Sequence, residues 1–263
     1  QVAESSASTK QRTGEDQSDY FDQDFSRQLF GQLDQQTGYA LVHGVGDAQM
    51  ASQILRDTNF NLVCVEEDPL IAEKTRVRFN DKAQYGKRIV VHKKVGVQLP
   101  YPDFMFNFIC VDIGALKGKE PLLSEYYRLL RPFGTLVIGG ISGAGDSLTL
   151  PKKRLKELVA NGGDIDGKFH ALKDQQWHVI NRGKLPGSGE WSHQYANPGN
   201  TACSEDIRIS GDLRLQWYGK PGPYRMFDRH SYTTAPVYSS GRLFTLGEKI
   251  LYANDAYNGR LLW

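Results

Sequence analysis

The sequence has little cysteine, little charge imbalance and no long apolar run, and each absence excludes a class of protein. Only three cysteines occur in 263 residues, at Cys64, Cys110 and Cys203, and their spacing gives neither a disulfide framework nor a set of metal ligands. The 32 basic and 30 acidic side chains leave a net charge of +2, so we expect no nucleic-acid-binding surface. No run approaches the roughly 18 apolar residues of a membrane-spanning helix, so we expect no span.

What the chain does have is enough apolar surface to form a core. Hydrophobic residues make up 40% and aromatic residues 11% of a chain long enough for one large or two modest domains. Residues 1–17 differ, because they are rich in Ser, Gln, Thr and acidic groups and are typical of a polar linker or tail. The chain begins at Gln1 rather than at methionine, so we expect the natural N-terminus to lie outside it.

The stretch 38–69 has the pattern of a strand, a glycine turn, a helix and a second strand. Gly44 and Gly46 follow the first apolar run, and the second run, residues 62–65, ends at Glu66. Glycine allows a sharp turn from strand to helix and lets a ligand approach the backbone there. A carboxylate at the tip of the second strand can accept hydrogen bonds from both hydroxyls of a ribose. Glu66 lies 22 positions after Gly44, where about 20 are expected, so the pattern predicts half of a nucleotide-binding α/β domain.

Two cofactor classes use such a turn, and the third glycine position separates them. A dinucleotide site requires G-x-G-x-x-G, but Gln49 occupies the last glycine position. The tighter G-x-G-x-G turn fits better, with Ala48 in place of its third glycine. On this turn and on VCVEEDP at 63–69, the chain resembles the class I S-adenosylmethionine methyltransferases, in which that segment reads V-x-V-D-x-S-P. The alternative is an α/β domain that keeps the turn for folding alone and binds nothing.

The resemblance implies a cofactor site made by Gly44, Gly46, Ala48 and Glu66, with Glu66 holding the ribose hydroxyls. A second segment, EYYRLLRPFGTLVI at 125–138, resembles E-x-x-R-x-L-R-P-G-G-x-L-x-I of the same family. Periodicity predicts an α/β fold over residues 18–182, with a doubly wound, mostly parallel sheet. The further elements expected are helices from Ser18, at 69–80, at 120–130 and from Pro151, and strands at 88–92, 105–112, 135–138 and 177–181.

The sequence departs from the family at the expected adenine site, and it carries no catalytic motif. Lys93 and Lys94 follow the third strand, near the place where a methyltransferase has an acidic residue for the adenine amino group. Ammonium groups cannot accept that hydrogen bond. Asp112 is the single candidate for a substrate-facing acid, and capping of the next loop is its alternative role. His43 lies beside the glycine turn, where a strand-end histidine bonded to backbone is the simpler interpretation.

The composition changes at Gly183, and residues 183–263 are rich in Gly, Pro, Trp and Tyr without a helical period, which predicts all-β structure. Short alternating runs at 235–239, 241–246 and 249–253 precede the ending DAYNGRLLW. This ending resembles the repeat of pyrroloquinoline-quinone (PQQ)-type β-propellers, A-x-D-x-x-T-G-x-x-L-W. The upstream GEWSHQYANPGNTACSED and LRLQWYGKPGP resemble the lead-in of propellers in bacterial, especially planctomycete, multidomain quinoproteins.

In those proteins a methyltransferase-like domain precedes the propeller. Propellers have about four to eight blades. The resemblance therefore implies that residues 183–263 are the first part of an incomplete propeller, a fragment whose partners are the remaining blades of a longer polypeptide. The alternative is a small β appendage packed against the α/β domain.

Three functions remain open at this point. The first is a catalytically degenerate methyltransferase-like domain that serves as a structural or ligand-binding module beside a propeller. The second is an active methyltransferase that uses S-adenosylmethionine on a small molecule. The third is the front end of a quinone-dependent dehydrogenase, with PQQ and calcium held by a complete propeller outside this chain. Propellers of this kind are usually exported, so an extracytoplasmic (periplasmic) location is expected, and a cytoplasmic one if the methyltransferase is active.

Overall fold

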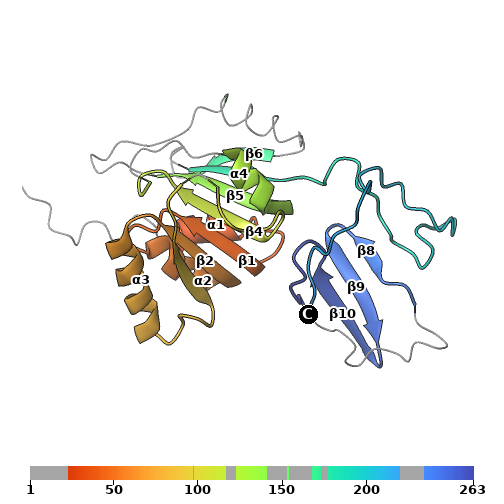
Figure 1. The fold of residues 1–263 in the computed structure, drawn as a ribbon, viewed down its shortest axis with the longest axis horizontal. Coiled ribbons are helices and arrows are strands. Elements are labelled where there is room, and N and C mark those ends of the chain that lie inside the picture. The colour runs from red at the N-terminus through yellow and green to blue at the C-terminus, as the bar shows by residue number, and fades with distance from the viewer. Residues whose placement is uncertain are drawn as a thin grey trace, which may run out of the picture.

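The computed structural model describes residues 23–96, 98–116, 123–140, 153, 168–172, 177–219 and 234–263. Within these ranges the chain forms a seven-stranded and a three-stranded sheet (Figure 1). The polar segment 1–17 and the helix expected from Pro151 lie outside the described residues. No helix in the described ranges is long and apolar enough to cross a lipid bilayer.

The large sheet is the doubly wound, mostly parallel sheet that the sequence predicts. Its strands follow the order β3-β2-β1-β4-β5-β7-β6. The first five of these are parallel neighbours, and β7 and β6 are added antiparallel at one edge. Their bounds are β1 Thr37–His43, β2 Asn59–Glu66, β3 Ile89–Lys93, β4 Phe106–Asp112, β5 Leu130–Gly139, β6 Lys168–Leu172 and β7 Trp177–Asn181.

Two details of the sheet differ from the sequence prediction. Strand β5 begins at Leu130 instead of Thr135, since Leu130 already pairs with Phe106 before the register shifts. Strand β6 was not predicted, because its segment KFHAL is only five residues long and its strand conformation depends on pairing with β7.

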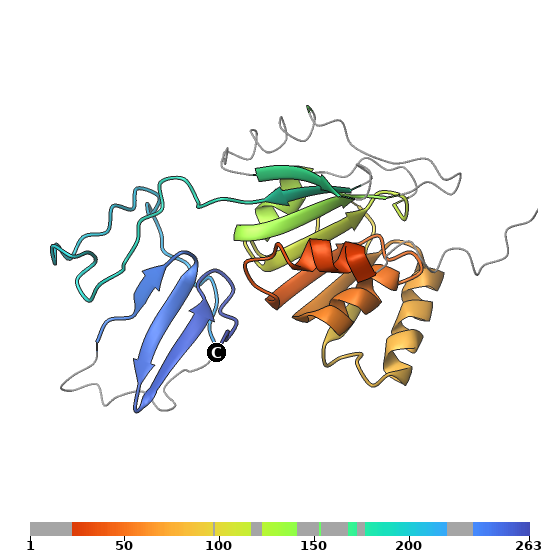
Figure 2. The same ribbon diagram turned by 180° about the vertical axis from the view of Figure 1, so that it is seen from behind.

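Helices cover both faces of this sheet (Figure 1, Figure 2). Helices α1 (Gln23–Phe30), α2 (Gln49–Asp57) and α3 (Pro69–Asp81) lie over one face, and α4 (Leu123–Leu129) lies over the other. Each face therefore has its own apolar core. The start of α3 is as predicted: Pro69 opens it, and Asp68 Oδ1 accepts a hydrogen bond from Leu70 N at 2.9 Å.

The winding direction reverses between β1 and β4. From β1 the chain moves outward through β2 to β3, and it then returns to place β4 on the other side of β1. In open α/β sheets, ligands bind outside the carboxyl ends of the strands at such a reversal. The fold therefore puts the candidate site at the ends of β1 and β4.

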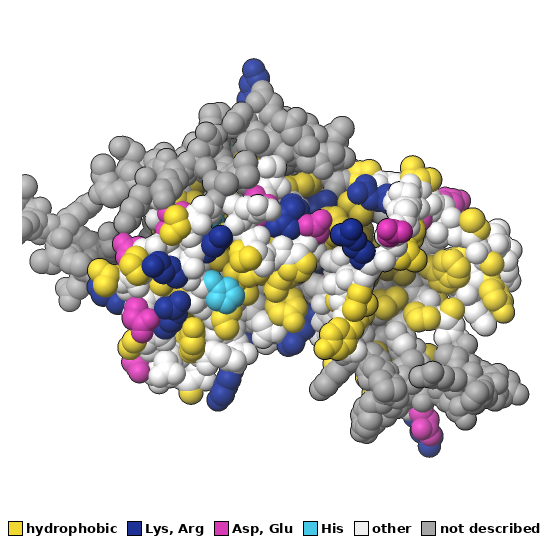
Figure 3. Space-filling view, viewed as in Figure 1, with side chains coloured by type: hydrophobic (Ala, Val, Ile, Leu, Met, Phe, Trp, Pro, Cys, Tyr) yellow, Lys and Arg dark blue, Asp and Glu magenta, His cyan; other side chains and the backbone are white. Residues whose placement is uncertain are grey.

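The C-terminal segment forms the three-stranded antiparallel sheet, in the order β10-β9-β8. Strands β8 (Val237–Ser239), β9 (Arg242–Gly247) and β10 (Ile250–Asp255) match the three predicted runs closely. The structure shows this small sheet and no propeller in the part of the chain that it describes. Residues 183–219 are irregular and expose several large apolar side chains, and apolar surface is extensive over the C-terminal part (Figure 3). The exposed side chains include Ile207, Ile209, Leu213 and Leu215.

The small sheet packs against the amino ends of the large sheet's strands. Asn107 Nδ2, at the start of β4, donates to Asp255 Oδ2 at 2.8 Å, and Asn258 Nδ2 donates to Met105 O at 2.9 Å. The seven residues of β1, at about 3.3 Å each, separate these contacts from the carboxyl ends of the strands. The C-terminal sheet therefore does not cover the candidate site.

Candidate functional site

The glycine turn that leads from β1 into α2 has three residues with left-handed backbone. The φ angles are 81° at Gly44, 55° at Gly46 and 63° at Ala48. Glycine adopts such angles without strain, whereas alanine at the third position pays a steric penalty of about 1 kcal/mol. The turn expected from the G-x-G-x-A pattern is therefore formed, with its strained residue at the N-cap of α2.

The two glycines are required for different reasons. A Cβ on Gly44 would lie 2.7 Å from Asp112 O, so the backbone at the end of β4 fills the space that a side chain needs. A Cβ on Gly46 would meet only Ala115 Cβ, at 3.6 Å, so its φ angle alone selects glycine. Gly44 thus brings the ends of β1 and β4 together, and this requirement holds without any ligand.

Glu66 is a buried part of the turn and not an exposed ligand group. Glu66 is only 3% exposed to solvent. Oε2 accepts a hydrogen bond from Val45 N at 2.9 Å, and Oε1 accepts one from Asp68 N at 3.0 Å. A carboxylate has about four lone-pair sites, so one site on each oxygen remains for a ligand. Glu66 therefore holds the turn in place, and the ribose contact that the resemblance implies would be added to this role.

Asp112 is the carboxylate at the end of β4, beside the glycine turn. Its pKa is raised to about 6 mainly by burial; hydrogen bonds from the Ala115 and Gly114 backbone oppose the shift, and the negative charges of Asp47 and Glu66 add a smaller contribution to it. The Ala115 N–H donates to Asp112 Oδ1 at 3.2 Å. The predicted alternative role of Asp112, capping the following loop, is thus present in the structure.

Charged groups of both signs lie around the glycine turn. Asp47 Oδ1 accepts the hydrogen bond of Gln49 N at 3.0 Å, so a carboxylate already occupies the start of α2, where a dinucleotide would place its pyrophosphate. Lys74 and Arg78 of α3 line a cavity of about 420 Å³ together with Asp47, and Arg78 Nη1 donates to Asp47 O at 2.7 Å.

His43 lies beside the turn and bonds to a side chain instead of to backbone. It is 5% exposed, and its Nδ1 lies 2.5 Å from Tyr126 Oη of α4. Nε2 is buried and has no hydrogen-bond partner among the residues that the structure describes. Burial lowers the pKa of His43 to about 4 against the opposing charge of Glu67, so the ring is neutral at pH 7. The sequence analysis did not identify Tyr126 as the partner of His43, because nothing local to α4 indicates this contact.

The expected adenine region contains an aromatic pair that the sequence analysis did not identify. Lys93 ends β3 with an exposed side chain, and Lys94 N donates to Glu66 O at 3.1 Å. His92, which precedes Lys93, stacks on the ring of Tyr101 with centroids 5.9 Å apart. His92 Nδ1 lies 2.7 Å from Tyr101 Oη. Nucleic-acid bases stack on aromatic side chains in this way. No group of three or more His, Cys, Asp or Glu side chains in the described ranges is arranged to hold a metal ion.

Comparison with known proteins agrees with the fold. No family model matches the chain. The 27-O-demethylrifamycin SV methyltransferase of Amycolatopsis mediterranei is 28% identical over 155 residues, which cover 56% of this chain and 55% of that protein. The chain thus spans about half the length of this curated relative. Together with the observed sheet, the similarity supports a methyltransferase-like domain.

Two crystal structures of similar chains have lower sequence identity. A candidate S-adenosyl-L-methionine-dependent methyltransferase from Methanococcus maripaludis aligns with a TM-score of 0.49 at 16% identity, over 61% of this chain and 84% of that one. A SAM-dependent methyltransferase from Aquifex aeolicus aligns with a TM-score of 0.45 at 15% identity, over 59% and 87%.

Proposed function

We propose that the α/β domain binds S-adenosylmethionine and transfers its methyl group to a small molecule. The observation that carries this proposal is the glycine turn of Gly44, Gly46 and Ala48, with Glu66 bonded to it from the end of β2, at the point where the sheet reverses direction. Asp112 lies beside the turn at the end of β4, and its carboxylate would favour the cationic sulfonium group of a bound cofactor. The small-molecule substrate is suggested by the relative, whose name specifies 27-O-demethylrifamycin SV.

Each residue has a separate task in this proposal. Gly44, Gly46 and Ala48 shape the turn, and Glu66 fixes it through Val45 N and binds the ribose with its remaining lone pairs. Asp112, at the end of β4, provides negative charge beside the cofactor. When bound, the cofactor supplies an electrophilic methyl group, and the chain's part is to hold donor and acceptor in line.

The adenine contact follows from the aromatic pair. Since Lys93 and Lys94 cannot accept a hydrogen bond from the adenine amino group, we assign adenine binding to stacking on His92 and Tyr101. Loss of affinity in Tyr101→Ala, with little change in Lys93→Ala, would support this assignment.

Calorimetric titration with S-adenosylmethionine and S-adenosylhomocysteine tests the proposal. Micromolar binding, about −8 kcal/mol, that is weakened in Asp112→Asn and in Glu66→Ala is the expected result. Asp112→Asn should weaken S-adenosylmethionine binding more than S-adenosylhomocysteine binding, because only the former carries the sulfonium charge. No binding of either compound at millimolar concentration would mean that the glycine turn serves folding alone.

A second candidate is a catalytically degenerate domain that acts as a structural or ligand-binding module next to a propeller. Its support is the small sheet, whose DAYNGRLLW turn is tied to the α/β domain through Asp255 and Asn258. In this proposal further blades belong to the same polypeptide, the protein is extracytoplasmic, and PQQ and calcium, if they are used at all, bind in a quinone-dependent dehydrogenase formed by those blades. Sequencing the gene in both directions tests it: a signal peptide and further repeats support it, and their absence contradicts it.

A further inference from the structure

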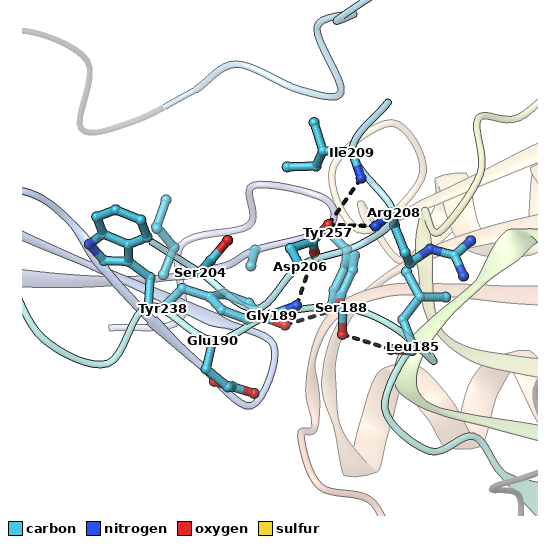
Figure 4. Close-up of a pocket in the computed structure, with 13 residues that line it drawn as sticks. Leu185, Ser188, Gly189, Glu190, Ser204, Asp206, Arg208, Ile209, Tyr238 and Tyr257 are labelled. Carbon is cyan, nitrogen blue, oxygen red and sulfur yellow. Dashed lines mark hydrogen bonds between the residues drawn. The ribbon is translucent and has the colours of Figure 1, made fainter. Parts of the chain in front are cut away.

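The C-terminal segment contains a cavity that takes no part in the proposed methyl transfer. It has a volume of about 460 Å³, within the range of small-molecule sites (Figure 4). The loops 185–191 and 204–209 form part of its wall, and β8, β9 and the turn after β10 form the rest. We propose that this cavity binds a small organic cation of the quaternary ammonium class.

Aromatic rings make up much of the wall. Trp191 and Tyr238 are opposite one another in an antiparallel bridge, because Trp191 N donates to Tyr238 O at 3.1 Å and Tyr238 N donates to Trp191 O at 2.7 Å. Opposite residues of such a bridge place their side chains on the same face. Tyr257 follows, with its Oη 3.0 Å from Tyr238 Oη. Three electron-rich rings from separate parts of the chain therefore line one cavity, and the faces of such rings attract cations.

Asp206 adds a fixed negative charge to the wall. Its Oδ2 accepts a hydrogen bond from Gly189 N at 2.9 Å, and its Oδ1 accepts bonds from Arg208 N at 2.8 Å and Ile209 N at 3.0 Å (Figure 4). The bond from Gly189 is the main reason that the pKa of Asp206 is lowered, so this carboxylate is ionised at neutral pH. The same bonds join the two loops and keep the cavity formed before a ligand arrives.

Arg208 is the one basic residue of the described lining, and its charge offsets only part of that of Asp206 because the guanidinium is held outside the cavity. Arg208 Nη1 donates to Pro186 O at 3.0 Å, and Figure 4 shows its guanidinium directed away from the Tyr238 ring. Glu190, the second acid, is 3.5 Å from Lys184 Nζ, but both side chains are more than a third exposed, at 35% and 41%. An exposed pair of this kind contributes about 0–1 kcal/mol, so a ligand cation can replace the lysine.

Choline and its uncharged carbon analogue, in which a quaternary carbon replaces the nitrogen, are the probes for the test. The two molecules have the same shape, so titration of the unmodified protein followed by calorimetry and NMR isolates the effect of charge. Choline should bind at least about tenfold more tightly than the analogue. Equal affinity for the two molecules would show that the cavity recognises apolar shape and not charge, and it would overturn the proposal. The absence of saturable choline binding would also overturn it.

Amino-acid substitutions test whether choline binds in this cavity. Trp191→Leu keeps an apolar side chain without a π face, and it should abolish the preference for choline, while Glu190→Gln should reduce it. The matched control is Tyr218→Leu, an aromatic residue that is 89% exposed and outside the lining, and it should bind choline as the unmodified protein does. Tyr257→Phe retains the ring and should retain choline binding. Choline binding that survives Trp191→Leu unchanged would contradict the proposed location.

Discussion

Arg131 and Asp255 form a buried ion pair between the two sheets. Arg131 Nε lies 2.9 Å from Asp255 Oδ2, and the side chains are 1% and 0% exposed. Arg131 belongs to β5, and Asp255 ends β10, so this buried pair is one of several contacts that link the α/β domain to the C-terminal sheet. Removing one partner leaves the other charge buried and uncompensated, which costs about 3–5 kcal/mol.

The first prediction follows from this pair. Asp255→Ala should lower the free energy of unfolding by about 3–5 kcal/mol in urea titration, because Arg131 stays buried without its counter-charge. The control is Asp24→Ala in the exposed Asp24–Arg27 pair, where the side chains are 78% and 76% exposed, and its expected cost is below about 1 kcal/mol. Equal effects of the two variants would show that the buried pair does not stabilise the contact between the sheets.

The second prediction concerns the glycine turn. Gly44→Ala should destabilise the protein by more than the cost of about 1–2 kcal/mol for a left-handed alanine, because the new Cβ also lies 2.7 Å from Asp112 O. Gly86→Ala is the control: its φ angle is 74°, but its Cβ would meet nothing within 4 Å. Thermal unfolding of both variants should give a clearly lower midpoint for Gly44→Ala. Similar midpoints would mean that the end of β4 moves aside readily.

The third prediction separates the structural role of Glu66 from its ligand role. Glu66→Gln should lower stability without any ligand by about 1–3 kcal/mol, because an amide replaces one of the two oxygens that accept Val45 N and Asp68 N. Glu73→Gln, on the exposed side of α3, is the control, since its side chain is 64% exposed and forms an ion pair with Arg76 at the surface. If Glu66→Gln changed cofactor affinity but left urea unfolding unaltered, the turn would not depend on this carboxylate.

The fourth prediction is a pH dependence from Asp112. Its pKa is raised to about 6 in the folded state from an ordinary 3.8, so the folded state binds more protons than the unfolded state between these values. The contribution of Asp112 to stability is therefore complete below about pH 4 and is lost as the pH rises through 6. In Asp112→Asn this loss should disappear. A stability difference between Asp112→Asn and the unmodified protein that stays constant from pH 4 to 7 would contradict the assignment.

Between about pH 4 and 6.5, His43 changes the stability of the fold in the direction opposite to Asp112. Its pKa is lowered to about 4 from an ordinary 6.5, so its unfolded form binds more protons and its contribution raises stability as the pH increases. The Asp112 titration should therefore be followed directly, by NMR of the carboxyl carbon. Adding S-adenosylmethionine should lower this pKa, because a cationic ligand favours the ionised carboxylate.

Local patterns predicted most of the α/β domain. The strand–turn–helix unit at 38–69, the cap at Asp68 and the three C-terminal strands depend on neighbours in the sequence, and they occur as expected. Strand β6 and the early start of β5 depend on pairing between distant segments. The division of the chain at residues 182 and 183 and the propeller remain predictions.

The sequence by itself determined which residues form the glycine turn and that an acid ends β2, because turn geometry and strand period are local properties. Only the tertiary structure decided what those residues contact. In the folded chain, both carboxylate oxygens of Glu66 accept hydrogen bonds from backbone amides, and His43 contacts Tyr126 on α4. Arg131 forms an ion pair with Asp255. The physical reason is that a buried polar group must find its partner wherever packing brings one, and packing joins segments whose separation along the chain carries no signal.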